Sequence, residues 1–125
     1  MRSAYLVEDN PAIRSMLSSA LEDMAGFEVT AFAETEDDAA HWLAAHCREA
    51  DVVVLDIELR AGSGLGVLRR RAEFPPGCRF VVLTNIATHD LRRRCLALGA
   101  EAVFDKTAEL DEFLDHCCRL PPRVH

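Results

Sequence analysis

Val52-Val53-Val54-Leu55-Asp56 is the stretch of sequence that decides the fold. Its three β-branched residues and one leucine form a continuous apolar run, which is typical of a strand covered on both faces in a parallel sheet. The run ends on a carboxylate, so we expect Asp56 at the carboxyl end of a central strand. Ligands bind outside these strand ends in open α/β sheets. Asp56 is therefore a candidate for chemistry, although on its own it is as readily explained as a solvated strand end.

Four further strands are predicted around this one. Residues 4–7, 80–83 and 102–104 are apolar runs, whereas residues 27–32 alternate apolar and polar side chains. Alternation indicates a strand that is less completely buried. We therefore expect residues 27–32 at an edge of the sheet.

Helical patterns separate the strands. Asn10 and Pro11 predict a helix start, and Gly26 predicts its end. Thr35 and Thr107 are expected to cap the second and the last helix. The apolar stripe of the first helix comprises Ile13, Met16, Leu17, Ala20, Leu21 and Met24. Five β-α units in alternation predict a doubly wound α/β fold, a five-stranded parallel sheet of order 2-1-3-4-5 with five helices.

Length and composition suit one domain, residues 1–125, with a core of about 3–119 and a short tail at 120–125. Half of the residues are hydrophobic, but no apolar run approaches the roughly 20 residues that cross a bilayer. The amino terminus lacks the pattern of a signal peptide, so we expect a cytoplasmic protein. A net charge of −7 argues against a DNA or membrane surface, and the arginine runs at 69–71 and 92–94 are interpreted as solvated helix faces.

Five cysteines lie at positions 47, 78, 95, 117 and 118. Their number is odd and no C-x-x-C spacing occurs, which suggests neither a disulfide framework nor a zinc site. We expect reduced and mostly buried thiols.

Polar residues follow four of the predicted strands: Glu8-Asp9, Asp56, Thr84 and Lys106. Three converging carboxylates repel one another unless they share protons or a divalent cation neutralises them, and hard oxygen ligands favour Mg²⁺. A hydroxyl and an ammonium suit the oxygens of a phosphoryl group, which makes Asp56 the candidate nucleophile. Each residue also has a purely structural explanation. However, Lys106 is the single lysine beside 13 arginines, and the joint arrangement favours phosphoryl transfer.

The arrangement resembles the receiver domain of two-component response regulators over almost the whole chain. The residues that carry the resemblance are, in order, Glu8-Asp9, Asp56, Gly64, Thr84 and Lys106. The resemblance implies a flavodoxin-like fold and a phosphoacceptor signalling domain of bacterial type, not an enzyme.

The resemblance also implies specific roles. A sensor histidine kinase or a histidine phosphotransfer protein would exchange phosphate with Asp56. Glu8, Asp9, Asp56 and the backbone carbonyl of Glu58 would surround Mg²⁺. Thr84 and Lys106 would contact the phosphoryl group, and movement of Thr84 would shift a surface formed by the fourth helix, the fifth strand and the fifth helix. That surface is also a candidate for homodimerisation, and the first helix for kinase docking.

Several positions depart from the family pattern. Val103 stands where an aromatic residue usually couples to Thr84, and Phe104 is its neighbour on the opposite strand face. Asn85 replaces a residue that is commonly small, and Thr107 replaces a proline after the lysine. A cis bond before a residue other than proline costs roughly 2.5–4 kcal/mol, so we expect a trans Lys106–Thr107 peptide.

Because Pro121-Pro122-Arg123-Val124-His125 follows the last helix, we expect a stand-alone receiver that signals through a protein partner or a phosphorelay. Two alternatives remain open. One is a pseudo-receiver that binds partners without phosphorylation. The other is a haloacid-dehalogenase-type phosphatase, which is disfavoured because Glu58 stands where those enzymes carry an aspartate.

Overall fold

The computed structural model describes residues 1–122 and contains one parallel sheet. The last part of the expected tail, residues 123–125, lies outside the described residues. The strands are β1 (Arg2–Val7), β2 (Phe27–Ala33), β3 (Val52–Leu55), β4 (Phe80–Thr84) and β5 (Ala102–Asp105). Their order is β2-β1-β3-β4-β5, which confirms the predicted topology.

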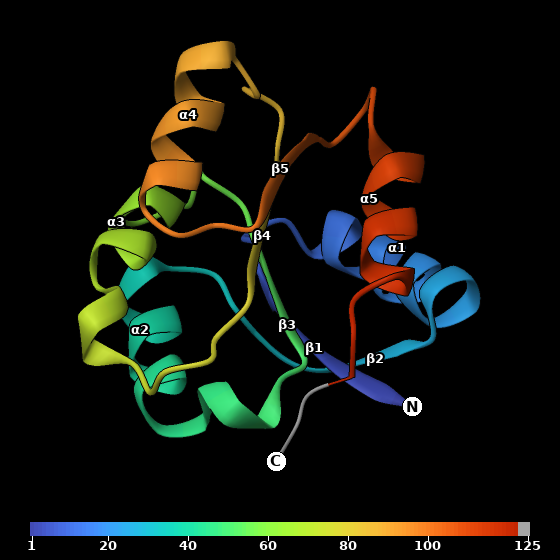
Figure 1. The fold of residues 1–125 in the computed structure, drawn as a ribbon, viewed down its shortest axis with the longest axis horizontal. Helices are drawn as coiled ribbons and strands as arrows, with labels where there is room; N and C mark the ends of the chain where they lie inside the picture. Colours follow the sequence, from blue (N-terminus) through green and yellow to red (C-terminus); the bar gives the residue numbers. More distant parts are fainter. Residues whose placement is uncertain (123–125) are drawn as a thin grey trace.

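Helices cover both faces of the sheet. The helices are α1 (Pro11–Ala20), α2 (Glu36–His46), α3 (Gly64–Arg69), α4 (His89–Ala97) and α5 (Leu110–Cys118). Short helical turns follow three of them: η1 (Leu21–Ala25), η2 (Cys47–Glu49) and η3 (Arg71–Glu73). Helices α1 and α5 lie on one side of the sheet, and α2, α3 and α4 lie on the other (Figure 1). Within residues 1–122, no helix combines the length and the apolar character needed to cross a membrane.

Strand β3 lies in the middle of the sheet because it can be buried on both faces. Val53 and Leu55 join the core beneath α2, α3 and α4, whereas Val52 and Val54 join the core beneath α1 and α5. All four residues are buried, as the continuous apolar run predicts. Strand β2 lies at an edge, and its alternation leaves Phe32 54% exposed.

The first helical segment differs from the expected stripe. Met16 is 43% exposed and Met24 is 66% exposed, so neither belongs to the core. Helix α1 ends in the π-helical turn η1, whose wider turn moves Met24 off the apolar stripe and places Ala25 in the core instead. Gly26 ends the segment in the left-handed conformation, with φ 73°, as predicted.

The start of the last helix also differs from the prediction. Thr107 does not cap it, because α5 begins at Leu110 and Glu109 occupies the cap position. A turn precedes the helix instead, in which the Asp105 carboxylate accepts hydrogen bonds from the backbone N–H groups of Thr107 and Ala108, both 2.8 Å. Turn formation by an aspartate thus displaces the helix start by two residues, because the cap position moves from Thr107 to Glu109. The Lys106–Thr107 peptide is trans, as expected.

One pair of cysteines contradicts the expectation of free thiols. Cys47 and Cys78 form a disulfide, with Cα atoms 5.9 Å apart. The two residues precede the neighbouring strands β3 and β4, so the topology brings them together at the amino ends of those strands. A separation of 31 residues carries no local spacing pattern, which is why the sequence did not indicate the pair. Cys95, Cys117 and Cys118 remain free, as predicted.

Two phenylalanines test the distinction between core and edge. Phe113 on α5 is fully buried and packs edge-on against Phe104, with ring centroids 6.1 Å apart. We expect Phe113→Ala to lower the free energy of unfolding by about 3–5 kcal/mol, because it leaves a cavity. Phe32→Ala, the same change at the exposed edge, should cost about 1 kcal/mol or less, the loss of its contact with Arg14. Urea denaturation measures both, and equal losses would contradict the described core.

Candidate functional site

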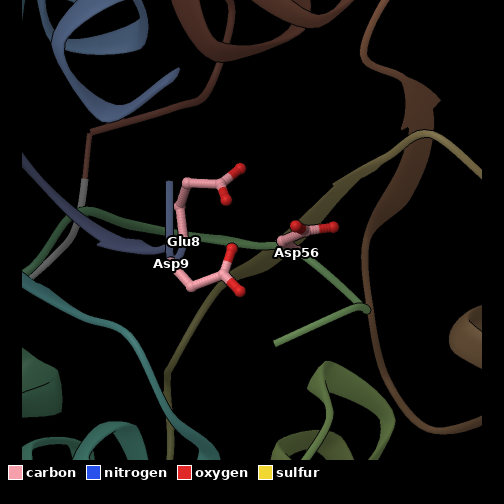
Figure 2. A group of neighbouring side chains, drawn as sticks. All are labelled: Glu8, Asp9 and Asp56. Atoms are coloured by element: carbon pink, nitrogen blue, oxygen red, sulfur yellow. The ribbon is translucent and has the colours of Figure 1, made fainter. Parts of the chain in front are cut away.

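Three carboxylates meet at the carboxyl ends of β1 and β3. Glu8 and Asp9 follow β1, and Asp56 follows β3, which pairs directly with β1 through Val7 and Leu55. Carboxylate oxygens of the three residues lie within 4.8 Å of one another. Figure 2 shows the side chains next to one another at the two strand ends. The switch point between β1 and β3 therefore carries the acidic cluster that the sequence predicts.

Glu8 is buried and both of its carboxylate oxygens have partners. The Lys106 ammonium donates to Oε1, and the backbone N–H of Asn10 donates to Oε2 at 3.1 Å. The side chain of Asn10 caps α1 by accepting from the N–H groups of Ala12 and Ile13, at 2.9 and 3.1 Å. The cap thus starts α1 directly beside Glu8, as the Asn-Pro pair predicts.

Asp56 is 6% exposed and has two strong contacts. Its Oδ2 accepts from the Lys106 ammonium at 2.8 Å, and its Oδ1 accepts from the backbone N–H of Ile57 at 2.8 Å. Lys106 reaches Asp56 from β5, across the end of β4, and its backbone N–H donates to the Thr84 carbonyl at 3.0 Å. One ammonium therefore contacts two buried carboxylates.

Burial and charge act in opposite directions on this group. Burial raises the pKa of the Glu8 carboxyl, hydrogen bonds from Lys106 and Asn10 partly offset this, and the negative charge of Asp56 adds to the rise. Burial disfavours the charged form of Lys106, but its hydrogen bonds to Asp56 and Glu8 outweigh that effect and raise its pKa. Because three carboxylates face one cation, the cluster carries excess negative charge.

The chemistry of this donor set fits a magnesium ion. Oxygen ligands from one or two carboxylates, with room for water, are what Mg²⁺ requires. The cluster opens into a cleft of about 250 Å³. The cleft is lined by Glu8, Asp9, Asn10, Ile13, Asp56, Glu58, Asn85 and Lys106.

The remaining predicted residues lie around the cleft. Glu58 and Asn85 are exposed and line it. Thr84 is fully buried at the end of β4, and its hydroxyl oxygen accepts from the backbone N–H of Ile86 at 3.3 Å. Thr84 does not line the cleft described above. Its hydroxyl thus contacts the loop that follows β4.

Gly64 is required by close packing behind Asp56. A Cβ atom at this position would overlap the backbone carbonyl of Asp56, and the Gly64 N–H donates to the Ile57 carbonyl at 2.9 Å. Only glycine allows the loop after β3 to fold back this closely. This explains the glycine among the residues that carry the resemblance to receiver domains.

Sequence reasoning missed Arg14, which supports the first strand end. Its guanidinium donates to the Glu8 backbone carbonyl at 2.8 Å, pairs with Glu34 at 2.8 Å and stacks over the Phe32 ring at 4.0 Å from its centroid. These contacts join α1 to the end of β2 across Glu8. No local pattern marks an arginine that acts across three elements.

The curated proteins with related sequences include a regulatory protein and a methylesterase. The chain is 31% identical over 111 residues to the photosynthetic apparatus regulatory protein RegA of Cereibacter sphaeroides, covering 89% of this chain and 58% of RegA. It is 33% identical over 112 residues to a protein-glutamate methylesterase/protein-glutamine glutaminase of Anaeromyxobacter dehalogenans, covering 86% of this chain and 32% of that protein. The chain thus spans about half or less of the length of these relatives.

Solved structures share the fold. The non-phosphorylated HemR receiver domain of Leptospira biflexa superposes with a TM-score of 0.80 at 26% identity and covers all of both chains. A chain of the CheX–CheY–BeF3–Mg²⁺ complex of Borrelia burgdorferi gives a TM-score of 0.81 at 22% identity, covering 91% of this chain and 84% of that one. The family model of the response regulator receiver domain matches residues 4–117. This match, together with the fold and the acidic cluster, places the chain in the family of response regulator receiver domains.

Proposed function

We propose that the protein accepts a phosphoryl group on Asp56 from a phosphohistidine and signals through a protein partner. The observation that carries this proposal is the buried Asp56 carboxylate, held by Lys106 at 2.8 Å and opening with Glu8 and Asp9 into one cleft. The proposal also draws on family membership, since receiver domains are signalling domains of two-component systems. RegA, the relative from Cereibacter sphaeroides, is described as a regulatory protein.

The reaction is the attack of an Asp56 carboxylate oxygen on the phosphorus of a phosphohistidine. An O–P bond forms as the P–N bond breaks, and the imidazole leaves. Lys106 Nζ, which already contacts Asp56 Oδ2, is placed to stabilise the negative oxygens of the transferring group. In reverse, a second histidine would take the phosphoryl group from Asp56, which is the phosphorelay form of the same chemistry.

Glu8, Asp9, Asp56 and the backbone carbonyl of Glu58 would hold Mg²⁺. When bound, the ion supplies charge neutralisation for the carboxylates and for the phosphoryl oxygens. Glu8 would keep one oxygen on Lys106 and thereby hold the ammonium beside Asp56. Asn85 and Glu58 border the open side of the cleft, where they would meet an incoming phosphoryl donor or water.

Signal output would begin at Thr84. If the hydroxyl turns from the N–H of Ile86 toward a phosphoryl group on Asp56, the loop before α4 would lose this hydrogen bond and could move. Helix α4, β5 and α5 form the proposed output and dimerisation surface, and α1 is the proposed docking face for the kinase. A protein partner is the expected reader of the change, because a net charge of −7 does not favour DNA.

Acetyl phosphate tests the phosphoacceptor. With Mg²⁺ and this small donor, the wild-type protein should gain the mass of one phosphoryl group, and Asp56→Asn should gain none, because the amide is not a nucleophile. Asp51→Asn makes the same change in the residue just before the amino end of β3, and this variant should still be phosphorylated. Intact-protein mass spectrometry measures all three. A wild type without adduct would support the pseudo-receiver, and continued turnover of unrelated phosphoesters would support the phosphatase.

Glu8→Gln tests the electrostatic cost of the cluster. The pKa of Glu8 is higher in the folded protein than in the unfolded chain, so the protonated form of Glu8 favours folding. This stabilisation is lost as the pH rises through the folded-state pKa. In EDTA at pH 7, Glu8→Gln should therefore raise Tm, and the gain should shrink toward pH 5. The variant should also lose most of the stabilisation that Mg²⁺ gives the wild type.

The matched control is Glu28→Gln, which removes a carboxylate from an exposed position of β2. Thermal unfolding with EDTA and with Mg²⁺ should not distinguish this control from the wild type. A Glu8→Gln protein that melts below the wild type in EDTA at pH 7 would show that the ionised carboxylate stabilises the metal-free fold.

A further inference from the structure

Glu36 connects the start of α2 to the loop that follows Asp56. Its Oε1 accepts from the backbone N–H of Ser63 at 3.1 Å, and its own backbone N–H donates to the Ala61 carbonyl at 3.0 Å. Its Oε2 lies 3.6 Å from the Arg70 guanidinium at the end of α3. The side chain is 23% exposed. Glu36 thus contacts the loop at two points, once through its carboxylate and once through its backbone N–H, and its carboxylate also faces the end of α3.

Two glycines make room for this carboxylate. Cβ atoms at Gly62 and Gly66 would both overlap the Glu36 side chain. Gly62 also has φ 73°, where glycine is favoured for its backbone conformation. Gly66 lies within α3 and has no such backbone requirement, so the space it leaves for Glu36 is the reason for a residue with low helix propensity there.

The loop transmits the contact to the acidic cleft. Ser63, which donates to Glu36, pairs across the loop with Glu58 in an isolated antiparallel bridge. The next residue, Gly64, donates to the Ile57 carbonyl and packs on the Asp56 carbonyl. The two halves of the loop therefore lie against each other. The half that contains Ser63 contacts Glu36, and the half that contains Glu58 lines the cleft.

We propose that Glu36 is a positioning residue for the magnesium site, which acts by holding residues 58–63 so that the Glu58 carbonyl faces Glu8, Asp9 and Asp56. The inference rests on the proposed function, because Glu58 is a ligand only in that proposal. Glu36 itself does not line the cleft. Outer partners that orient a metal ligand commonly contribute a factor of roughly 10–100 to metal affinity.

The test is the affinity of the purified protein for Mg²⁺, measured by isothermal titration calorimetry. Glu36→Ala removes both carboxylate oxygens and should weaken binding about tenfold. Glu36→Gln keeps an acceptor oxygen for Ser63 and should retain near wild-type affinity. Asp37→Ala is the matched control, because it removes the same charge from the same helical turn and the same Arg70 partner, at 3.0 Å, without a contact to the loop.

Gly66→Ala supplies an independent perturbation of the same contact. Its methyl group should displace the Glu36 carboxylate and weaken Mg²⁺ binding about as much as Glu36→Ala, by roughly tenfold. In the Glu36→Ala background the methyl group has space, so the second change should have little further effect. A double-mutant cycle thus predicts strong non-additivity between positions 36 and 66.

Hydrogen exchange separates positioning from a general loss of stability. Amides of residues 58–64 should exchange faster in Glu36→Ala than in Asp37→Ala, while amides of β3 and β4 should remain as protected as in the wild type. A Glu36→Ala protein with wild-type Mg²⁺ affinity, or one whose defect is shared by Asp37→Ala, would overturn the inference and leave the proposed function standing. A wild type that binds no Mg²⁺ and forms no adduct on Asp56 would overturn both.

Discussion

The contact of one ammonium with two buried carboxylates is the constraint on which the site depends. Lys106 Nζ contacts Asp56 and Glu8, and its backbone is hydrogen-bonded to Thr84. The three charged residues follow β1, β3 and β5, and the strand order β1-β3-β4-β5 brings them to the same edge of the sheet. Buried carboxylates are costly to desolvate unless each of their oxygens accepts a hydrogen bond. Glu8 and Asp56 meet that requirement through the N–H groups of Asn10 and Ile57.

The same excess charge links stability to ligand binding. Burial without full neutralisation raises the pKa of Glu8, so the metal-free fold is disfavoured by the charge that would bind a cation. A cation that binds only the folded chain then adds stability by mass action. The charge of the site thus lowers the stability of the metal-free protein, and such a cost in stability is common at functional sites.

Much of the fold and of the acidic cluster was predictable from the sequence, because both rest on patterns along the chain. The apolar run of β3 fixes its burial on both faces, and the order of the strands then brings Asp56 to Glu8 and Asp9.

What the sequence did not predict depends on contacts between distant segments. Cys47 meets Cys78 through the pairing of β3 with β4, and Glu36 meets the loop after Asp56 through the packing of α2 on α3. The misplaced cap at Thr107 has a local cause, since Asp105 forms a turn that competes with the helix start.

The replacement of the usual aromatic residue by Val103 changes how Thr84 could reach the output surface. Val103 is buried beneath α4, and its carbonyl accepts from the Arg92 guanidinium at 2.8 Å. Arg92 also donates to the Ala87 carbonyl at 3.1 Å and to Glu109 at 2.5 Å. One side chain on α4 therefore contacts the loop after Thr84, the strand before Lys106 and the residue at the cap position of α5. In the proposed function, a displacement of the loop at Ala87 would alter these bonds, so a path from Thr84 to α4 and α5 would run through a charged side chain instead of an aromatic ring.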